Sequence, residues 1–462
     1  GYLLPDYFDR DADNRPTESP IRLADQRPDA FGQMGGIVFG AGTTFAFPEL
    51  PVYETVEAED GRYVYRFQTE EGVVVTREWS VQDGLLEGAV TVQNGSSSPQ
   101  SHSLGWTLAL DAPEGVQSDS SWFSFSFPTD HLEGLCWTDG SVERAALSSL
   151  VSETEQYDES VRWVAVDRQY FVAGLVPRDR DEVDCLMEAR DDTVRVLARL
   201  DPVDLRPGES RRHTFTMYLG VKKPDILTRV DAQLEDAIDY TLLGMSLAPL
   251  CVFLLWILGL FQQLTGSWGL AIIGLTVLVK SVTFPLNQKQ GKSMRAMTAL
   301  RPEMELIRTK FAEDRQRQSE ELMKLYRKHN VNPAGGCLPM LIQMPIWFAL
   351  YRSLWVSVDL YQEPFLWLSD LTVGDPYFAL PLLLMLVMFL QQRILPTAMD
   401  PAQQKMMQYF MPLMFGMFMV ALPAGLCLYI LVNTLLTIVQ QHFINRSIGP
   451  PSGGTSPAAQ PS

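Results

Sequence analysis

Lys280 is the residue of this 462-residue chain whose type and position most directly suggest chemistry. No Asp, Glu, Lys or Arg occurs between Thr241 and Val279, so Lys280 ends a long uncharged run. It precedes Lys289, the first of a group of basic residues, by nine positions, which is about 13 Å of depth along a helix. A lysine side chain cannot snorkel that far, and a charge at the centre of a membrane helix costs about 2.5 to 3.5 kcal/mol. We therefore expect the ammonium group to face a water-filled cavity.

Uncharged polar residues provide candidate neighbours for Lys280. Thr276 precedes it by four residues and so lies on the same face of a helix. Gln343, Tyr429 and Asn433 interrupt other apolar segments. These residues predict a shared polar groove for substrate binding. The alternative is that Lys280 hydrogen-bonds main-chain carbonyl groups in a packed helix bundle.

Motifs for catalysis or nucleotide binding are weak. Gly291-Lys292-Ser293 resembles the end of a phosphate-binding loop, but Leu286 occupies the position of the required earlier glycine. The sequence has no HExxH motif, and the expected membrane segments hold no Asp, Glu or His before His442. Catalysis inside the bilayer therefore lacks a general base. We predict no catalytic residue, no cofactor and no metal.

The charges divide the chain into two parts. Lys and Arg number 21 against 44 Asp and Glu before Tyr240, and 16 against 11 after it, which gives net charges of −23 and +5. The acidic first part argues against DNA or other nucleic acid as its partner, because phosphate binding requires clustered basic residues. The five cysteines form no CxxC pair, and Cys136 and Cys185, both in the acidic part, could form a disulfide.

Alternation of apolar and polar residues with period two indicates antiparallel β structure from 61 to 220. The alternating sets are Tyr63, Tyr65 and Phe67; Val90 and Val92; Phe123, Phe125 and Phe127; and Phe215, Met217 and Leu219. Turn signals at Asn94-Gly95 and Pro207-Gly208 separate the strands. We predict a large β-sandwich over 31–220, and a linker with interfacial helices over 221–263. The linker begins with one short helix, opened by Pro224, whose apolar stripe is Leu227, Val230, Leu234 and Ile238.

The second part has the composition of a membrane domain, because about 20 apolar residues span a bilayer. A second uncharged run extends from 406 to 445, and the turn residues 422–425 divide it into two helices. We expect an α-helical core over 264–447 with five spans, at about 267–286, 338–358, 376–394, 407–421 and 426–445. The ends, 1–30 and 448–462, are rich in Pro, Asp, Gly and Ser, which predicts disorder.

Loop charges predict the orientation. Residues 286–335 carry eleven Lys or Arg against six acids, which indicates a cytoplasmic segment, and heptad-like apolar spacing predicts a helical hairpin over 288–331. Residues 359–375 carry four acids and no Lys or Arg, which suits the opposite side. Alternating spans then place the C-terminus in the cytoplasm. The apolar residues that face each other in the hairpin are best explained as its own core, but methionines there could contact clients or partners. The candidates are Met294, Met297, Met304 and Met323.

The apolar residues 242–260 decide on which side of the membrane the acidic domain lies. If they cross the membrane, the domain is cytoplasmic; if they lie along the outer surface, it is extracytoplasmic. They are apolar on all sides, which by itself favours a crossing. An extracytoplasmic domain also needs a way across the membrane, and we expect an N-terminal anchor helix that this sequence does not show.

Several segments together resemble the YidC/Oxa/Alb family of membrane-protein insertases. The resemblance rests on 332–339 (NPAGGCLP) with its continuation to Tyr351, on 279–286 (VKSVTFPL), and on 400–406, 422–426 and 429–441. It covers about 220–447, and the β-domain fits the bacterial type. The resemblance implies a periplasmic β-supersandwich and an interfacial helix, not a span, at 242–260. It also implies a five-helix core that encloses a hydrophilic groove open to cytoplasm and lipid.

The family resemblance implies an insertase and folding chaperone of the bacterial inner membrane, which needs no nucleotide and is not an enzyme. The implied partners are newly made membrane proteins, the Sec translocase, the ribosome and the lipid bilayer. Lys280 stands where the family usually has arginine, so the charge is kept but the planar fork is lost. Thr276 and Tyr429 match the polar threonine and tyrosine of the family.

Two other functions are compatible with parts of the sequence. A transporter could bind an anionic solute at Lys280, but no inverted repeat and no second charged group for ion coupling is visible. The β-domain could instead act on carbohydrate, since related sandwiches include sugar epimerases. Its histidines, His102, His131 and His213, lie in no recognisable acid–base setting in the sequence.

Overall fold

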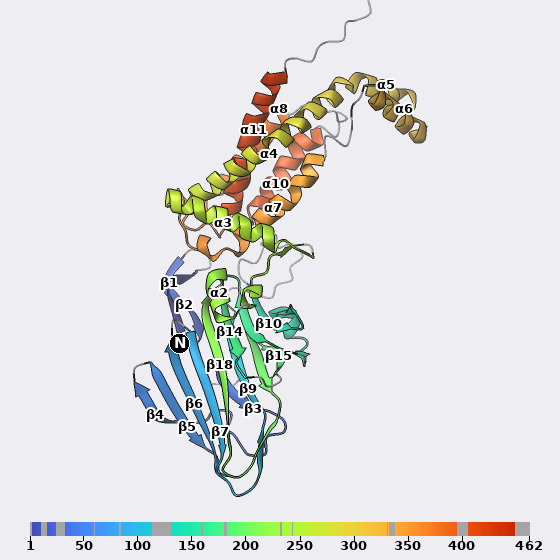
Figure 1. Cartoon of the computed structure of the whole chain (residues 1–462). Coiled ribbons are helices and arrows are strands. Elements are labelled where there is room, and N and C mark those ends of the chain that lie inside the picture. Colours follow the sequence, from blue (N-terminus) through green and yellow to red (C-terminus); the bar gives the residue numbers. More distant parts are fainter. Residues whose placement is uncertain are drawn as a thin grey trace, which may run out of the picture. The chain divides into compact units, whose positions relative to one another are not determined.

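The computed structural model of the chain contains two compact units (Figure 1). It describes residues 2–10, 16–24, 33–59, 61–82, 85–112, 131–158, 160–179, 183–231, 233–242, 244–329, 331, 338–394 and 405–448. The first, here called the β unit, comprises Gly1–Ser124, Pro128–Asp239 and Val356–Tyr361. The second, here called the helical unit, comprises Tyr240–Trp355 and Gln362–Ser462. The boundary at residues 239 and 240 coincides with the change in charge along the sequence.

The β unit is built on two antiparallel sheets, as expected for a sandwich (Figure 1). The larger sheet has the order β11 (Ser141–Ala146), β10 (Leu132–Thr138), β13 (Trp163–Arg168), β14 (Phe171–Pro177), β18 (Ser210–Val221), β7 (Leu85–Asn94), β6 (Val73–Gln82), β5 (Arg62–Gln68) and β4 (Glu54–Glu59). The smaller has the order β12 (Glu155–Tyr157), β15 (Val183–Arg190), β16 (Thr193–Leu200), β9 (Leu104–Asp111) and β3 (Gly36–Phe39). Two-residue periodicity therefore identified the fold class.

The alternating residues form the core in the central strands but not near the edge. Val90 and Val92 of β7 are buried, as are Phe215 and Met217 of β18, the neighbouring strand. In β5, however, Val64 is buried while Tyr63 is 41% exposed. β5 is second from the edge of its sheet. The predicted set at 123–127 lies outside the described residues.

A disulfide joins the two sheets of the β unit. Cys136 of β10 is bonded to Cys185 of β15, and both side chains are fully buried. β10 lies in the nine-stranded sheet and β15 in the five-stranded sheet, so the bond ties the sandwich together across its core. The disulfide that the sequence allowed but did not establish is thus present.

A segment that is distant in sequence completes the β unit. Val356–Tyr361, here called the strap, contributes Val358 and Tyr361 to the buried core. The Tyr361 ring lies 5.6 Å from that of Phe171, centroid to centroid, in an edge-to-face arrangement. Lys223 Nζ is 2.6 Å from Asp359 Oδ1. Residues 359–361, the first of the acidic segment 359–375, therefore pack in the β unit.

Two expectations for the first 240 residues are wrong. The segment predicted to be disordered includes β1 (Tyr2–Arg10) and β2 (Pro16–Ala24), which pair antiparallel with irregular register. The linker helix predicted from Pro224 is broken into α2 (Pro224–Val230) and the 3₁₀ turn η1 (Leu234–Ala237). The break lies at Asp231, whose backbone is extended and whose carboxylate accepts hydrogen bonds from Arg162. The apolar stripe itself is buried as predicted.

The helical unit contains α3 (Ala248–Thr265), α4 (Trp268–Ala299), α5 (Arg301–Lys310), α6 (Arg315–Lys328), α7 (Leu338–Val356), α8 (Ala379–Ile394), the π-helical η4 (Met406–Phe410), α10 (Met411–Met419) and α11 (Ala424–Ile448). α4 packs against α3 and α11, and α8 packs against α10 and α11 (Figure 1). The helical structure is interrupted at 420–423, between α10 and α11, and this interruption overlaps the predicted turn at 422–425. Each expected span contains helix, and the assignment of five spans stays a prediction.

Two helix boundaries differ from the sequence prediction. α3 begins at Ala248, with a proline in its first turn, and ends at Thr265. The next residue, Gly266, caps the helix with a φ of 68°, the left-handed conformation that glycine favours at a helix end. α4 continues through Pro285 to Ala299, so the hairpin consists of α5 and α6 and begins at Arg301. The residues after Pro285 are mainly good helix formers, whereas Pro302 fits only the first turn of a new helix.

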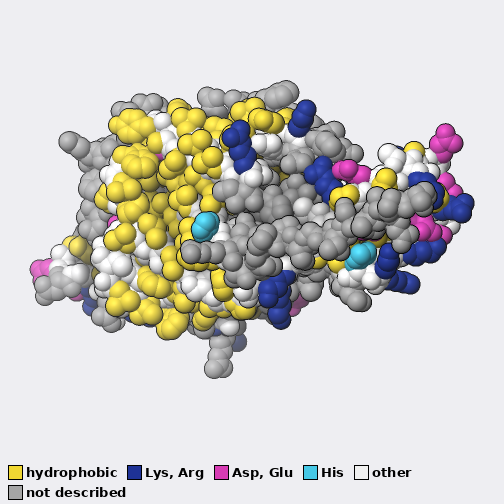
Figure 2. Space-filling model, turned by 90° about the horizontal axis from the view of Figure 1, so that it is seen from above, with side chains coloured by type: hydrophobic (Ala, Val, Ile, Leu, Met, Phe, Trp, Pro, Cys, Tyr) yellow, Lys and Arg dark blue, Asp and Glu magenta, His cyan; other side chains and the backbone are white. Residues whose placement is uncertain are grey.

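The helical unit exposes many large apolar side chains. On α3 these include Phe253, Trp256 and Leu264, the last 73% exposed. Figure 2 shows broad hydrophobic areas, with basic and acidic side chains gathered on the arm at the right, which holds α5 and α6. By length and composition, three helices among the described residues could cross a membrane, namely α3, α4 and α11. Exposed apolar area of this extent marks contact with lipid or with another apolar partner.

Candidate functional site

Lys280 lies at a buried contact between two helices of the helical unit. Its side chain extends from α4 and is 5% exposed. The ammonium Nζ donates a hydrogen bond of 2.8 Å to the hydroxyl oxygen of Thr437 on α11. No carboxylate forms an ion pair with Lys280 among the described residues. The cation is therefore held by a neutral side chain.

A second contact fixes the main chain of Lys280. Gln440 of α11 donates from Nε2 to the carbonyl oxygen of Lys280 at 3.1 Å. Asn287, two turns further along α4, donates to Oε1 of the same glutamine at 3.2 Å. Lys280, Asn287, Thr437 and Gln440 form a continuous polar contact, here called the α4–α11 seam. The seam fixes the register of the two helices around the lysine.

The other predicted groove residues lie on α4, α7 and α11, but they do not hydrogen-bond to Lys280 in the described structure. Thr276 is fully buried and its hydroxyl donates to the Ile272 carbonyl at 2.6 Å. Tyr429 is buried and Asn433 half-buried on α11, and Gln343 is half-buried on α7. Within the described part of the chain, no hydrogen bond joins Lys280 to any of these four.

Sequence reasoning missed Thr437, Gln440 and Asn287. A signal for Thr437 was present, because Tyr429, Asn433 and Thr437 recur at intervals of four residues and so follow one face of a helix. Gln440 and Asn287 carried no comparable signal, since both lie among other polar residues where the apolar segments end.

The hairpin methionines separate into buried and exposed side chains. Met304 is 3% exposed and packs with Leu300 and Leu325 in the core of the hairpin. Met323 is 45% exposed, and Met297 is half-buried near the end of α4. The Met294 side chain lies outside the described part of the structure. Met304 thus supports the hairpin itself, whereas Met323 is available for contact with a partner.

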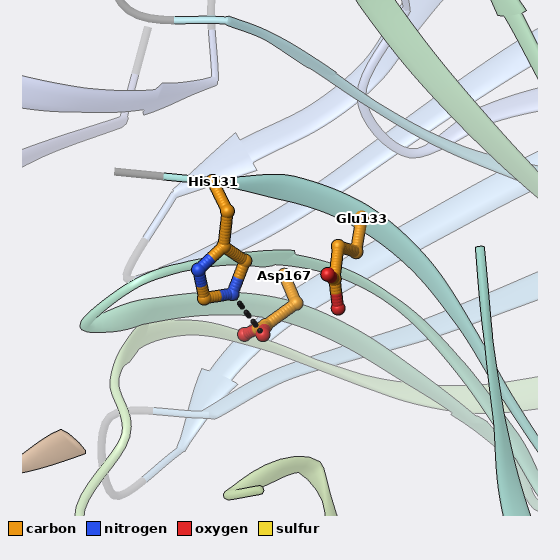
Figure 3. Close-up of side chains that lie close together, drawn as sticks. All are labelled: His131, Glu133 and Asp167. Atoms are coloured by element: carbon orange, nitrogen blue, oxygen red, sulfur yellow. Dashed lines mark hydrogen bonds and ion pairs between the residues drawn. The ribbon is translucent and has the colours of Figure 1, made fainter. Parts of the chain in front are cut away.

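The β unit holds a cluster of charged side chains around Asp167 (Figure 3). His131 Nε2 is 3.2 Å from Asp167 Oδ2, and Glu133 lies beside them. Ligand atoms of these three residues lie within 4.8 Å of one another, a spacing that a metal ion could use. Lys222 Nζ, however, lies 2.8 and 3.0 Å from the two oxygens of Asp167. Arg144 also approaches both carboxylates, at 3.9 and 4.0 Å.

This cluster fits an ion-pair network rather than a metal centre, because two basic side chains already neutralise its two carboxylates. Burial alone would raise the pKa of Asp167, but Lys222 and His131 outweigh it and hold the pKa below its usual value. For His131, burial acts to lower the pKa, whereas the hydrogen bond and charge of Asp167 raise it above 6.5. The histidine therefore has an acidic partner that its sequence neighbourhood did not reveal.

Comparison with known protein families covers nearly the whole chain. Residues 3–253 match the family described as the YidC periplasmic domain, and residues 260–450 match the family described as the 60Kd inner membrane protein. The two matches meet close to the boundary between the β unit and the helical unit. They therefore assign both units to one type of protein.

Individual relatives agree with the family matches. A membrane protein insertase YidC of Methylococcus capsulatus is 34% identical over 442 residues, which is 93% of this chain and 79% of the relative. The membrane protein insertase YidC of Anaeromyxobacter dehalogenans (strain 2CP-C) is 42% identical over 317 residues, or 69% of this chain. That match spans 57% of the length of the relative. A crystal structure of an active YidC insertase is 22% identical, covers 88% of this chain and 83% of its own, and has a TM-score of 0.39.

Proposed function

Because the chain belongs to the YidC family of membrane protein insertases, we propose that it inserts hydrophobic segments of newly made proteins into the bacterial inner membrane. The observation that carries the proposal is the buried Lys280, held by Thr437 and by no carboxylate in the described structure. An ammonium group has three N–H donors. One of them is bonded to Thr437, which leaves capacity for polar groups of a client.

The proposed role of Lys280 is to receive the polar flank of a client segment. A carboxylate that enters the apolar bilayer without a partner carries a large desolvation cost. A positive charge inside the helical unit lowers that cost, because opposite charges attract strongly where water is scarce. Lys280 therefore assists clients whose outer flank is acidic. Thr276, Gln343, Tyr429 and Asn433 are proposed to line the same path.

The apolar part of the client is proposed to leave into lipid beside α7 and α10. On α10, Leu413, Met414 and Met417 are exposed, the last by 63%. Transfer of about 20 apolar residues from water into the bilayer supplies the driving force, so no nucleotide hydrolysis is needed. We propose that exposed apolar side chains of the hairpin, such as Met323, make the first contact with the client.

We propose that the β unit is periplasmic and that the hairpin is cytoplasmic. The buried Cys136–Cys185 disulfide supports this orientation, since disulfides persist in oxidising compartments such as the periplasm. The excess of basic residues between 286 and 335 supports a cytoplasmic hairpin. Contact of the basic hairpin with the ribosome, and association of the protein with the Sec translocase, are parts of the same proposal.

The test is insertion of a small client by the purified full chain. The protein is reconstituted alone into liposomes, and a single-span client with an acidic outer tail is scored by protease protection. We expect protection without an ion gradient or nucleotide. Lys280→Met should lower protection of this client but leave a client with a neutral tail nearly unaffected, whereas Lys280→Arg should retain activity because the charge is kept.

Two results would contradict the proposal. Equal protection in empty liposomes would show that the client inserts by itself. Normal insertion of the acidic-tailed client by folded Lys280→Met protein would show that Lys280 does not receive the client.

A further inference from the structure

Thr437 is set up to accept a hydrogen bond from Lys280. Its hydroxyl hydrogen is directed at the main-chain carbonyl of Asn433, one turn earlier on α11, at 2.7 Å. A hydroxyl group has one hydrogen to donate and two lone pairs to accept. With the hydrogen committed to Asn433, the lone pairs of Thr437 remain for the Lys280 ammonium group, 2.8 Å away.

The rest of the α4–α11 seam contacts the main chain of Lys280, at the opposite end of the residue from the ammonium group. Gln440 binds the carbonyl oxygen of Lys280, and Asn287 orients Gln440. Both the main chain and the ammonium of Lys280 are thus bonded to α11. A lysine side chain is flexible, with a four-carbon stem, so a bonded ammonium has a defined position only while an acceptor is present.

We propose that Thr437 is the positioning residue that holds the Lys280 ammonium ready for an acidic group of the client. This inference rests on the proposed function of Lys280. Thr437 occupies one of the three N–H donors, so a client carboxylate binds the others without displacing it. A hydroxyl also leaves the positive charge uncompensated, whereas an acidic residue at the same place would neutralise it.

Thr434 provides a matched control on the same helix. Its hydroxyl also donates to a carbonyl one turn earlier, that of Ile430, at 2.7 Å, and its side chain is buried. It makes no hydrogen bond with Lys280 in the described structure. Replacement of either threonine by valine removes a hydroxyl of the same kind with little change in volume. A difference between the two variants therefore reports on the contact with Lys280.

The experiment measures client insertion by the reconstituted full chain carrying Thr437→Val, Thr437→Ser or Thr434→Val, each with Lys280 and with Lys280→Met. For a client with an acidic outer tail, we expect Thr437→Val to lower insertion roughly tenfold, the order set by one hydrogen bond to a charged group. Thr437→Ser and Thr434→Val should stay close to wild type. A neutral-tailed client should respond to none of them. In the Lys280→Met background, Thr437→Val should have no further effect.

Several outcomes would overturn the inference. An equal loss from Thr437→Val in the Lys280→Met background, or for the neutral-tailed client, would show that Thr437 acts through packing. An increase in insertion would show that Thr437 competes with the client. A loss in Thr434→Val equal to that in Thr437→Val would show a general effect on α11. Failure of the proposed function is distinguishable, because Lys280→Met alone would then leave insertion of the acidic-tailed client unchanged.

Discussion

The two units each bury one lysine to the same extent but give it a different partner. Lys222 in the β unit and Lys280 in the helical unit are both 5% exposed. Lys222 contacts both oxygens of the buried Asp167, whereas Lys280 donates to the hydroxyl of Thr437. When a buried charge is matched by an opposite charge, removal of either partner is strongly destabilising, because the other charge is left uncompensated. A buried charge without a counter-charge marks a candidate functional site.

The largest expected effect is the loss of stability on removal of Lys222, the buried lysine that has a counter-charge. Lys222→Met should destabilise the β unit by about 3 to 5 kcal/mol, because it leaves the buried Asp167 without its main counter-charge. The double variant Lys222→Met/Asp167→Leu should recover most of this loss. Urea unfolding of the full chain in detergent, followed by tryptophan fluorescence, measures both. If Lys222→Met were as stable as wild type, Lys222 would not stabilise the fold, and the proposed contrast with Lys280 would be wrong.

The disulfide should contribute a similar amount to the β unit and nothing to the helical unit. The bond closes a loop between residues separated by 49 positions, for which chain entropy predicts about 4 kcal/mol. Cys136→Ser/Cys185→Ser should lower the urea midpoint of the β unit accordingly. Cys251→Ser, at a buried free cysteine on α3, is the control in the helical unit. An unchanged urea midpoint of the β unit in Cys136→Ser/Cys185→Ser would show that the cross-link between the sheets does not contribute to stability.

Removal of the unmatched charge should cost no stability. Lys280→Met replaces a buried cation by an apolar side chain of similar length, and we expect a gain of about 1 kcal/mol or no change. Thermal unfolding of the helical unit, measured by circular dichroism in the same detergent, tests this. A clear loss of stability would instead make Lys280 a structural residue like Lys222.

The smallest effect concerns the pH dependence of the β unit. The pKa of His131 is raised above 6.5 in the folded state, chiefly by Asp167 against the opposing effect of burial. Protonated His131 therefore adds stability that is fully present below about pH 6.5 and is lost as the pH rises through the folded pKa. The difference in melting temperature between wild type and His131→Gln should shrink from pH 6 to pH 8. A constant difference would mean that His131 acts by packing alone.

Orientation of the units can be checked by cysteine labelling in intact cells. Cysteines introduced at the exposed Ser97 and Ser369 should react with an impermeant reagent from outside, and one at Gln318 only after the membrane is opened. This follows from the loop charges and the disulfide. Protection of Ser97 in intact cells would place the β unit in the cytoplasm and make α3 a span.

Local patterns in the sequence determined the main divisions of this protein. The change of charge at residue 240, the alternation with period two and the long uncharged runs depend only on residues close together in the chain. They correctly indicated a β-sandwich followed by a helical unit with a break between α10 and α11. The position of Lys280 at the end of an uncharged run likewise needed no knowledge of distant residues, and motif resemblance indicated the family.

Only the tertiary structure decided which residues meet. Thr437 is 157 positions from Lys280, and Asp167 is 55 positions from Lys222. The strap enters the β core from beyond α7, and Asp231 ends α2 because Arg162, on a distant segment, binds it. Charge, periodicity and propensity describe each segment by itself, whereas the partner of a buried group depends on long-range packing. The sequence therefore placed Lys280 at the end of its uncharged run, but it could not show that Lys222 meets a buried carboxylate and Lys280 a hydroxyl group.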